Sequence, residues 1–146
     1  MADRNNNSEL LHVRLVTPDR VLLDSTASAV ELPSISGYLE ALYGAAPLLS
    51  ELGAGEVRLH GGATGEQIFF VASGVVEVLP DRVTILAETA LRPEEIDVKA
   101  AEAELVQSQE MWKQAGDEQQ KYDEANTVAR VAEEKIASAT HRNATR

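Results

Sequence analysis

Three histidines are the residues best suited to chemistry in this chain of 146 residues: His12, His60 and His141. They lie far apart in the sequence, and no two have the H-x-x-x-H or H-E-x-x-H spacing that brings two imidazoles to one metal ion. The carboxylates are numerous, but their spacing assigns no pair to acid–base catalysis. We therefore predict no catalytic residue and no metal site.

Two glycine-containing stretches were compared with known active-site loops. The segment GGATGEQ (61–67) lacks the Gly-Lys-Ser/Thr with which a phosphate-binding loop supplies a cation and a magnesium ligand. Ser73-Gly74 lies between two expected strands, whereas a nucleophile elbow joins a strand to a helix. Both stretches are more typical of turns. The sequence thus indicates a non-enzymatic binding or structural protein without a cofactor.

Charge and hydropathy restrict the partners of the chain. Acidic residues outnumber basic residues by 24 to 13, which gives a formal net charge of −11. Nucleic-acid-binding proteins normally present a basic face, and anionic lipids attract basic segments, so we expect neither as a direct partner. No apolar run approaches the roughly 18 residues of a membrane span, so at a membrane another protein would have to hold this chain. The polar start predicts a disordered tail over residues 1–9.

Up to about residue 90, short runs rich in Val, Ile, Thr and Phe alternate with turn residues. The breaks include Pro18-Asp19, Gly61-Gly62, Ser73-Gly74 and Pro80-Asp81. No helical segment separates the runs, so we predict an antiparallel β-sandwich or flattened barrel over residues 10–90. The expected strands are 12–17, 20–25, 27–33, 56–60, 67–73, 75–79 and 82–88.

After residue 92 the apolar pattern becomes helical. Pro93 suits a helix N-terminus, and Gly116-Asp117 is the expected break between two helices. We predict a two-helix hairpin over residues 91–140, held weakly because alanine buries little surface, and a short tail over 141–146. The whole chain is then of the α+β class. The apolar stripes expected are Ile96, Ala100, Ala103, Val106 or Gln107, and Glu110 or Met111 in the first helix, and Tyr122, Ala125, Ala129, Ala132, Ile136 and Ala139 in the second.

The stretch GYLEALYGAAPLLSEL (37–52) fits neither pattern. It is rich in Leu and Ala, yet Gly44 and Pro47 interrupt it, and it contains Tyr38 and Tyr43, two of the three tyrosines. Exposed apolar segments mark partner surfaces, and aromatic residues are favoured at interface cores. We interpret the stretch as a docking loop and not a core element. The alternative is a further strand over residues 38–43.

Several segments, taken in order, resemble the epsilon subunit of F-type ATP synthases over about residues 9–140. VASGVVEVLPDRVTILAETALRPEEID (71–97) is similar to that family's strand–turn–strand leading into its first helix. LVTPDRVLLDSTASAVELP (15–33) resembles the family's first strands. In the stretch 37–52 the chain departs from the family pattern at Glu40, Tyr43 and Ala45, where Gly, Pro and His are usual. The positions that it keeps there are Gly37, Leu42, Gly44, Ala46, Pro47, Leu48 and Leu49.

The resemblance implies a non-catalytic rotor subunit in the central stalk of a proton-translocating ATP synthase, which couples ring rotation to ATP synthesis. The sheet domain would grip the gamma subunit and rest on the ring of c subunits, at the cytoplasmic face of the bacterial inner membrane. The helical arm would reach the alpha and beta catalytic subunits. The positions expected to face the c-ring are Tyr38, Leu39, Glu40, Leu42, Tyr43, Gly44 and Ala45.

The resemblance also implies two possible properties of the helical arm, inhibition of ATP hydrolysis and ATP binding. Family members that bind ATP carry the pattern Ile/Leu-Asp-x-x-Arg-Ala at the start of the first helix. Here Ala100 occupies the Arg position, and losing such a charge-assisted contact costs about 1.5–3 kcal/mol, so we expect weak or no ATP binding. Whether the arm inhibits or stays folded is left open. The motif positions are Ile96, Asp97, Ala100 and Ala101, with Arg130 as a phosphate partner; the expected arm contacts are Arg130, Lys135 and Arg142.

A second hypothesis places the chain outside ATP synthase. In that case it is a β-sandwich adaptor whose helical hairpin binds an unrelated partner. Association with a gamma-type subunit distinguishes the two hypotheses.

Overall fold

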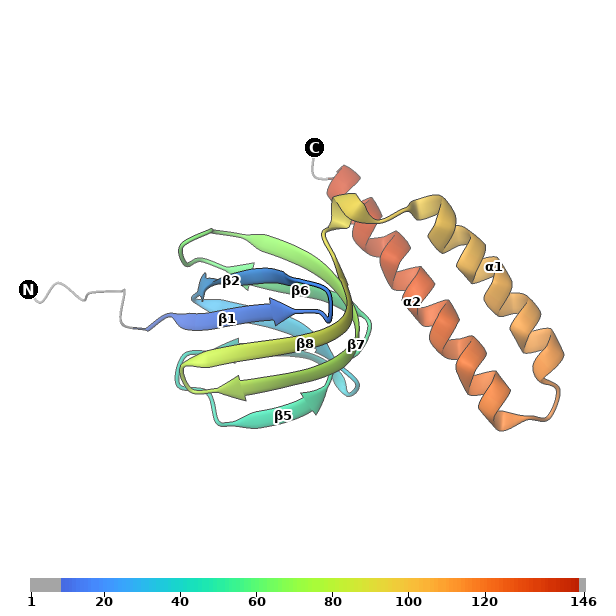
Figure 1. Cartoon of the computed structure of the whole chain (residues 1–146), viewed down its shortest axis with the longest axis horizontal. Helices are drawn as coiled ribbons and strands as arrows, with labels where there is room; N and C mark the ends of the chain where they lie inside the picture. Colours follow the sequence, from blue (N-terminus) through green and yellow to red (C-terminus); the bar gives the residue numbers. More distant parts are fainter. Residues whose placement is uncertain (1–8, 145–146) are drawn as a thin grey trace, which may run out of the picture. The chain divides into compact units, whose positions relative to one another are not determined.

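The computed structural model describes residues 9–144, with side chains described as far as Thr140. The chain divides into two compact units, Met1–Ala90 and Leu91–Arg146. Within the described residues, eight strands form the first unit and two helices the second (Figure 1). The predicted sandwich followed by a helical hairpin, and with it the α+β class, is confirmed. The tail expected over residues 1–9 lies, apart from Glu9, outside the described residues.

The strands follow one another closely, and a short turn separates them from the helices. The elements are β1 (Leu11–Val16), β2 (Val21–Ala27), β3 (Ala29–Ser34), β4 (Gly37–Leu42), β5 (Leu48–Glu51), β6 (Gly55–His60), β7 (Gln67–Leu79), β8 (Arg82–Leu91), the 3-10 turn Pro93–Glu95, α1 (Val98–Ala115) and α2 (Gln119–Ala144).

Strand β7 belongs to two layers, because its two halves have different partners. Residues 67–71 pair with β6, whereas residues 75–78 pair with β5. One layer therefore contains β4, β3, β6 and the first half of β7. The other contains β5, the second half of β7, β8, β1 and β2. Figure 1 shows β7 and β8 as long curved ribbons, and the two layers form an open sandwich instead of a closed barrel.

The bend of β7 lies at Ser73 and Gly74, which both have positive φ, 59° and 135°. A Cβ built on Gly74 would lie 2.0 Å from the carbonyl oxygen of Leu86 in β8. Glycine is therefore needed both for the backbone conformation and for the close approach of β8. The residue pattern predicted a turn here and two separate strands, 67–73 and 75–79. That prediction was wrong, because the two residues bend the strand without ending it.

The core lies between the two layers and follows the alternation of the strands. In β1, for example, Leu11, Val13 and Leu15 are fully buried, and the residues between them are exposed. Phe69 of β7 and Ile85 of β8 are among the largest fully buried side chains. At roughly 25 cal/mol per Å² of apolar surface, this inward-facing set is the main stabilising contribution to the first unit.

Two further features of the sheet differ from the prediction. Residues 37–42 and 48–51 form strands β4 and β5, so the interpretation of the whole stretch 37–52 as a loop was wrong, and the alternative of a further strand was correct. Gly37, at φ 122°, lets the chain reverse and pair with β3. In addition, β1 pairs with β8 in parallel, not antiparallel. The six intervening strands provide the long connection that a parallel pair needs.

The second unit begins with the 3-10 turn, and α1 begins only at Val98. The Asp97 side chain accepts a hydrogen bond from the backbone N–H of Ala100 at 3.1 Å and thereby caps the helix. The predicted helix start at Pro93 was therefore too early, because Pro93 opens the short turn instead. Gly116, at φ 54°, ends α1, which confirms the predicted break.

Small residues are buried where α1 and α2 run side by side (Figure 1). In α2 the predicted stripe is largely confirmed, since its four alanines are buried. In α1 the prediction was wrong: Ala100 and Ala103 are exposed, and the buried positions recur every seven residues. Alanines lie on more than one face of α1, so their spacing alone could not identify the buried one. The buried residues are Ala101, Ser108 and Ala115 in α1, and Ala125, Ala129, Ala132, Ser138 and Ala139 in α2.

Replacing Gly74 by Ala is expected to lower the melting temperature far more than replacing Gly65 by Ala. Both glycines have positive φ, but a Cβ at Gly65 would meet nothing within 4 Å. Gly65→Ala should therefore lower the free energy of unfolding only by the cost of placing alanine at positive φ, about 1–2 kcal/mol. Gly74→Ala adds the clash with β8. Thermal denaturation followed by circular dichroism measures both, and equal losses would contradict the role assigned to the bend.

Candidate docking surface

The connection from β4 to β5 is fixed against the turn between β7 and β8. The backbone N–H of Gly44 donates a hydrogen bond to the carbonyl of Pro80 at 2.7 Å, and that of Ala45 donates to the carbonyl of Leu42 at 3.1 Å. Gly44 adopts φ 84°, which favours glycine. The bond between Gly44 and Pro80 joins the two connections at one end of the sandwich, and the bond between Ala45 and Leu42 closes the turn after β4.

Four large apolar side chains are exposed beside this pair of turns, and we call them the apolar end: Leu42, Tyr43, Leu48 and Leu49. Leu49 has the largest exposed fraction, 70%. An exposed apolar group of this kind normally marks a surface that a partner covers. Leu48 and Leu49 were not among the predicted site residues, although the run Pro-Leu-Leu that contains them indicates an exposed apolar segment.

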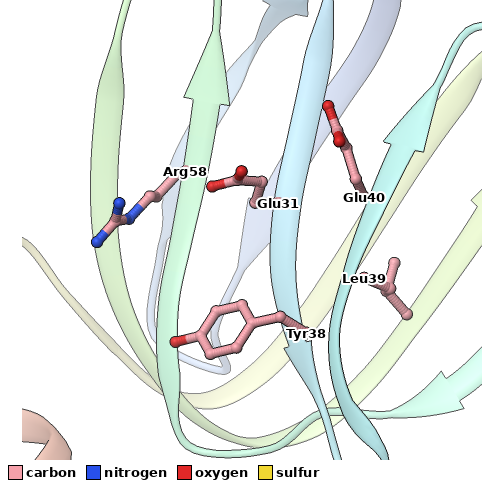
Figure 2. A pocket seen from close by; sticks show the side chains of 5 residues that line it. All are labelled: Glu31, Tyr38, Leu39, Glu40 and Arg58. Carbon is pink, nitrogen blue, oxygen red and sulfur yellow. The ribbon is translucent and has the colours of Figure 1, made fainter.

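The structure separates the two tyrosines that the sequence analysis placed on one loop. Tyr38 is near the start of β4, and its ring reaches across β3 so that its hydroxyl accepts a hydrogen bond from the backbone N–H of Glu56 at 3.0 Å (Figure 2). Leu42 lies four residues further on, a distance of roughly 13 Å along an extended strand. Tyr43 follows Leu42, so only Tyr43 belongs to the apolar end.

The remaining positions expected to face the c-ring do not share one surface either. Leu39 and Ala45 pack against the core of the sandwich, and Gly44 lies in the fixed turn. Glu40 and Leu42 are exposed on the outer face of β4. The expected set therefore divides into residues that position the surface and residues that form it.

A shallow pocket of about 470 Å³ lies over β4, β3 and β6 (Figure 2). Glu40 is directly opposite Glu31 in the register of β4 and β3. Arg58 is opposite Glu31 on β6, but its Nε and Nη2 donate their hydrogen bonds to Glu56 Oε2, at 3.0 and 2.7 Å. The pocket is lined by Glu31, Tyr38, Leu39, Glu40 and Arg58.

A second apolar surface lies on the other layer, and we call it the apolar row: the exposed Val21, Val75 and Leu86, and the half-buried Val16. Val16 is opposite Leu86 in β8 and opposite Val21 in β2. Val75 and Leu86 line a depression of about 380 Å³ together with Val16. The sequence did not reveal this row, because alternation shows which residues face outward but not which strands lie side by side.

His60, at the end of β6, is ion-paired with two carboxylates. Its Nδ1 lies 2.6 Å from Glu66 Oε2, and its Nε2 lies 3.5 Å from Glu31 Oε2. Partial desolvation, the largest single contribution, lowers the pKa of His60, but the hydrogen bonds and charges of the two carboxylates together outweigh it and raise the pKa. His12 similarly bonds Asp24, and this hydrogen bond lowers the pKa of the Asp24 carboxyl.

His12 and His60 are therefore both paired with carboxylates. Over the described part of the chain, no three His, Cys, Asp or Glu side chains come together as metal ligands. The side chain of His141 lies outside the described residues.

The positions of the degenerate ATP motif have structural roles at the start of the arm. Asp97 caps α1, Ile96 is buried just before it, and Ala101 is buried in the hairpin. Ala100 is exposed and offers no charge to a phosphate. Arg130 is exposed on α2.

Of the other predicted arm contacts, Lys135 is already engaged within the hairpin. Its Nζ lies 3.3 Å from Glu104 Oε2 of α1, and the Lys135 side chain is only 19% exposed. Arg142 is in the helical part of α2, but its side chain lies outside the described residues.

The first unit matches a known protein family. Residues 10–93 match the family described as ATP synthase, Delta/Epsilon chain, beta-sandwich domain. The ATP synthase epsilon chain of Koribacter versatilis is 39% identical over 112 residues, which cover 76% of this chain and 78% of that one. The chain belongs to the ATP synthase epsilon chain family. The epsilon chain of Chromohalobacter salexigens is 36% identical over 119 residues, covering 82% of each chain.

A solved structure also shares the fold of this epsilon chain. A chain of the Euglena gracilis mitochondrial ATP synthase, in a structure of OSCP, F1 and the c-ring, matches with a TM-score of 0.75. The match covers 88% of this chain and 81% of that one, at 16% identity. At this identity it shows the likeness of fold alone.

Family membership confirms the resemblance found in the sequence. As an epsilon chain, the protein is a non-catalytic subunit of ATP synthase, and the adaptor outside ATP synthase is set aside. No helix within residues 9–144 is both long and apolar enough to cross a membrane.

Replacing Glu66 by Gln is expected to lower the pKa of His60, because it removes a hydrogen-bond partner and a negative charge. The raised pKa of folded His60 means that its stabilisation is complete below the unfolded value of about 6.5 and is lost as pH rises through the folded pKa. The epsilon chain should therefore lose stability relative to Glu66→Gln over that window. NMR titration of the His60 ring and melting curves between about pH 6 and 8 measure this. An unchanged His60 midpoint in the variant would contradict it.

Proposed function

We propose that this epsilon chain is a rotor subunit that rests on the c-ring of the ATP synthase through its apolar end. The observation that carries the proposal is the group of four exposed apolar side chains beside the fixed turn at Gly44. A surface that is already fixed loses little conformational entropy on binding, and removing it from water is favourable. The proposed c-ring surface retains Leu42 and Tyr43 from the predicted ring-facing residues. It adds Leu48 and Leu49.

We assign the apolar row to the gamma subunit. A rotor subunit must hold the stalk and the ring at the same time, which requires two separate surfaces. The apolar row includes Val16, the last residue of β1. The other end of β1 lies beside the apolar end, because the backbone N–H of His12 donates to the carbonyl of Asp81 in the β7–β8 turn. The row and the apolar end therefore lie toward opposite ends of the sandwich, as two different partners require.

In this role the subunit couples rotation of a proton-translocating ring to ATP synthesis. It would be a peripheral subunit, held by the complex at the cytoplasmic face of the bacterial inner membrane. The Euglena gracilis assembly that contains a chain of like fold also contains F1 and a c-ring, which is the context proposed for this chain. The acidic net charge suits contact with basic partner segments and not with anionic lipid.

The helical arm is assigned a regulatory role toward the alpha and beta catalytic subunits. Its helices meet through small residues, which bury little area, and through the ion pair between Lys135 and Glu104. Opening the hairpin would break this pair and free Lys135 for acidic surfaces of the catalytic head, in addition to Arg130, which is already exposed on the same helix. Arg142 remains an expected contact of the same kind.

ATP is assigned no role as a cofactor of this subunit. Ala100 supplies no cation, and the carboxylate of Asp97 is used as a helix cap. Arg130 alone is a weak basis for holding a triphosphate. Calorimetric titration of the full chain with ATP is expected to show no micromolar binding, and such binding would overturn the assignment.

Replacing Tyr43 by Ala is expected to weaken assembly of the epsilon chain into ATP synthase without changing its melting temperature. Tyr43 is 47% exposed at the apolar end, so truncation removes partner contact but little core. Tyr122→Ala on α2 is a matched control, because Tyr122 is 46% exposed. Reconstitution of depleted enzyme with each variant measures the loss, expected to be about tenfold for Tyr43. A lower melting temperature with normal assembly would show that Tyr43 is a core residue.

Removing residues 91–146 is expected to raise ATP hydrolysis by the assembled enzyme, because the arm is then absent. Glu104→Gln is expected to have the opposite effect, since losing the ion pair favours the open arm. ATPase assays of reconstituted enzyme measure both. If neither variant alters hydrolysis, the hairpin is a permanently folded part of the stalk and the regulatory role is wrong.

A further inference from the structure

Strand β4 is the last strand of its layer, and among the described residues no strand lies along its outer edge. The hydrogen bonds of β3 show which backbone N–H and C=O groups of β4 point to its open edge. The carbonyl of Pro33 accepts a hydrogen bond from Gly53, so it points away from β4. Pro33 is opposite Tyr38, so this is a non-hydrogen-bonded pair, and Tyr38 directs its own N–H and C=O to the open edge.

Backbone alternation gives Glu40 the same outward direction as Tyr38. Gly44, two residues beyond the end of β4, confirms this direction by donating to Pro80 and not to β3. Apart from the charge of Glu40, the strand lacks several features that protect an edge. It contains no Pro and no Lys, and its six residues pair with β3 without a bulge. The edge is therefore open to a further strand.

The outer face of β4 determines which strand would fit. Glu40 is directly opposite Glu31, and like charges in that relation are destabilising. Glu31 has cationic neighbours, His60 Nε2 at 3.5 Å and Arg58 opposite it on β6, although Arg58 is also bound to Glu56. Glu40 has no ion pair among the described residues, so it is the less compensated of the two carboxylates. Tyr38 and Leu42, two residues to either side of Glu40, are exposed on the same face. The shallow pocket lies in this region and leaves room for an incoming side chain (Figure 2).

We propose that an extended basic segment of a neighbouring ATP synthase subunit adds to β4 as a further strand. The residue opposite Glu40 would project to the same face as Glu40. A Lys or Arg at that position would lie against Glu40 and within reach of Glu31, relieving their repulsion. The residues two positions away on either side would cover Tyr38 and Leu42. The recognised segment thus has the pattern apolar-x-Lys/Arg-x-apolar. This inference rests on the proposed function, because it places the partner within the same complex.

Hydrogen exchange and two substitutions test the backbone and charge parts of this inference separately. On incorporation of the epsilon chain into depleted ATP synthase, the amides of Tyr38 and Glu40 should exchange at least about tenfold more slowly. Those of Leu39 and Ala41, already bonded to β3, should change little. Glu40→Gln should raise the dissociation of the subunit about three- to tenfold, and Glu40→Pro, which also removes the edge N–H, should raise it further.

Glu102→Gln on α1 is the matched control, because it makes the same charge change at an exposed helix position. It should leave dissociation unchanged. If the wild-type chain incorporates but the β4 amides are not slowed, or if both Glu40 variants dissociate like Glu102→Gln, strand addition at β4 is overturned while the proposed function stands. If the wild-type chain does not incorporate at all, both proposals are overturned. Slowed β4 amides together with weaker binding of both Glu40 variants support the inference.

Discussion

The bend of β7 at Ser73 and Gly74 is the constraint on which the rest of the sandwich depends. Because the two halves of this strand have different partners, one continuous strand connects the layer of β6, β3 and β4 with the layer of β5, β8, β1 and β2. The carbonyl of Leu86 approaches Gly74 too closely for any side chain there. Glycine at this position therefore allows β8 to lie close against β7 where β7 bends.

The turn between β7 and β8 then positions the surfaces to which we assign function. Pro80 accepts the hydrogen bond from Gly44, which holds the connection after β4 and exposes Leu42 and Tyr43 beside Leu48 and Leu49. The same bend places Val75 near Leu86 in the apolar row. The well-packed core holds both apolar surfaces in place before a partner binds. Binding therefore does not carry the entropy cost of ordering them. The arm differs, because its small-residue contact is suited to opening.

Local sequence patterns predicted most of the strands, the break at Gly116 and the buried alanines of α2, because alternation and glycine breaks are local properties. Strand β4 was predicted only as an alternative to a loop, because the backbone hydrogen bonds that make it a strand come from β3, while its side chains are largely exposed. The buried face of α1 was missed because alanines lie on several faces. Tyr38 was grouped with Tyr43 because sequence distance does not show that β4 is extended between them. The apolar row could not be predicted from the sequence, since only the tertiary fold shows that β1 pairs with β8.

Site-specific photocross-linking in the assembled enzyme tests the central claim most directly, that the apolar end meets the membrane ring. A photoreactive residue at Leu49, whose side chain is 70% exposed, is expected to form an adduct with the c subunit. The same probe at Ile35, which is 60% exposed in the turn between β3 and β4, is expected to form none with that subunit. A c-subunit adduct from Ile35 and none from Leu49 would contradict the account.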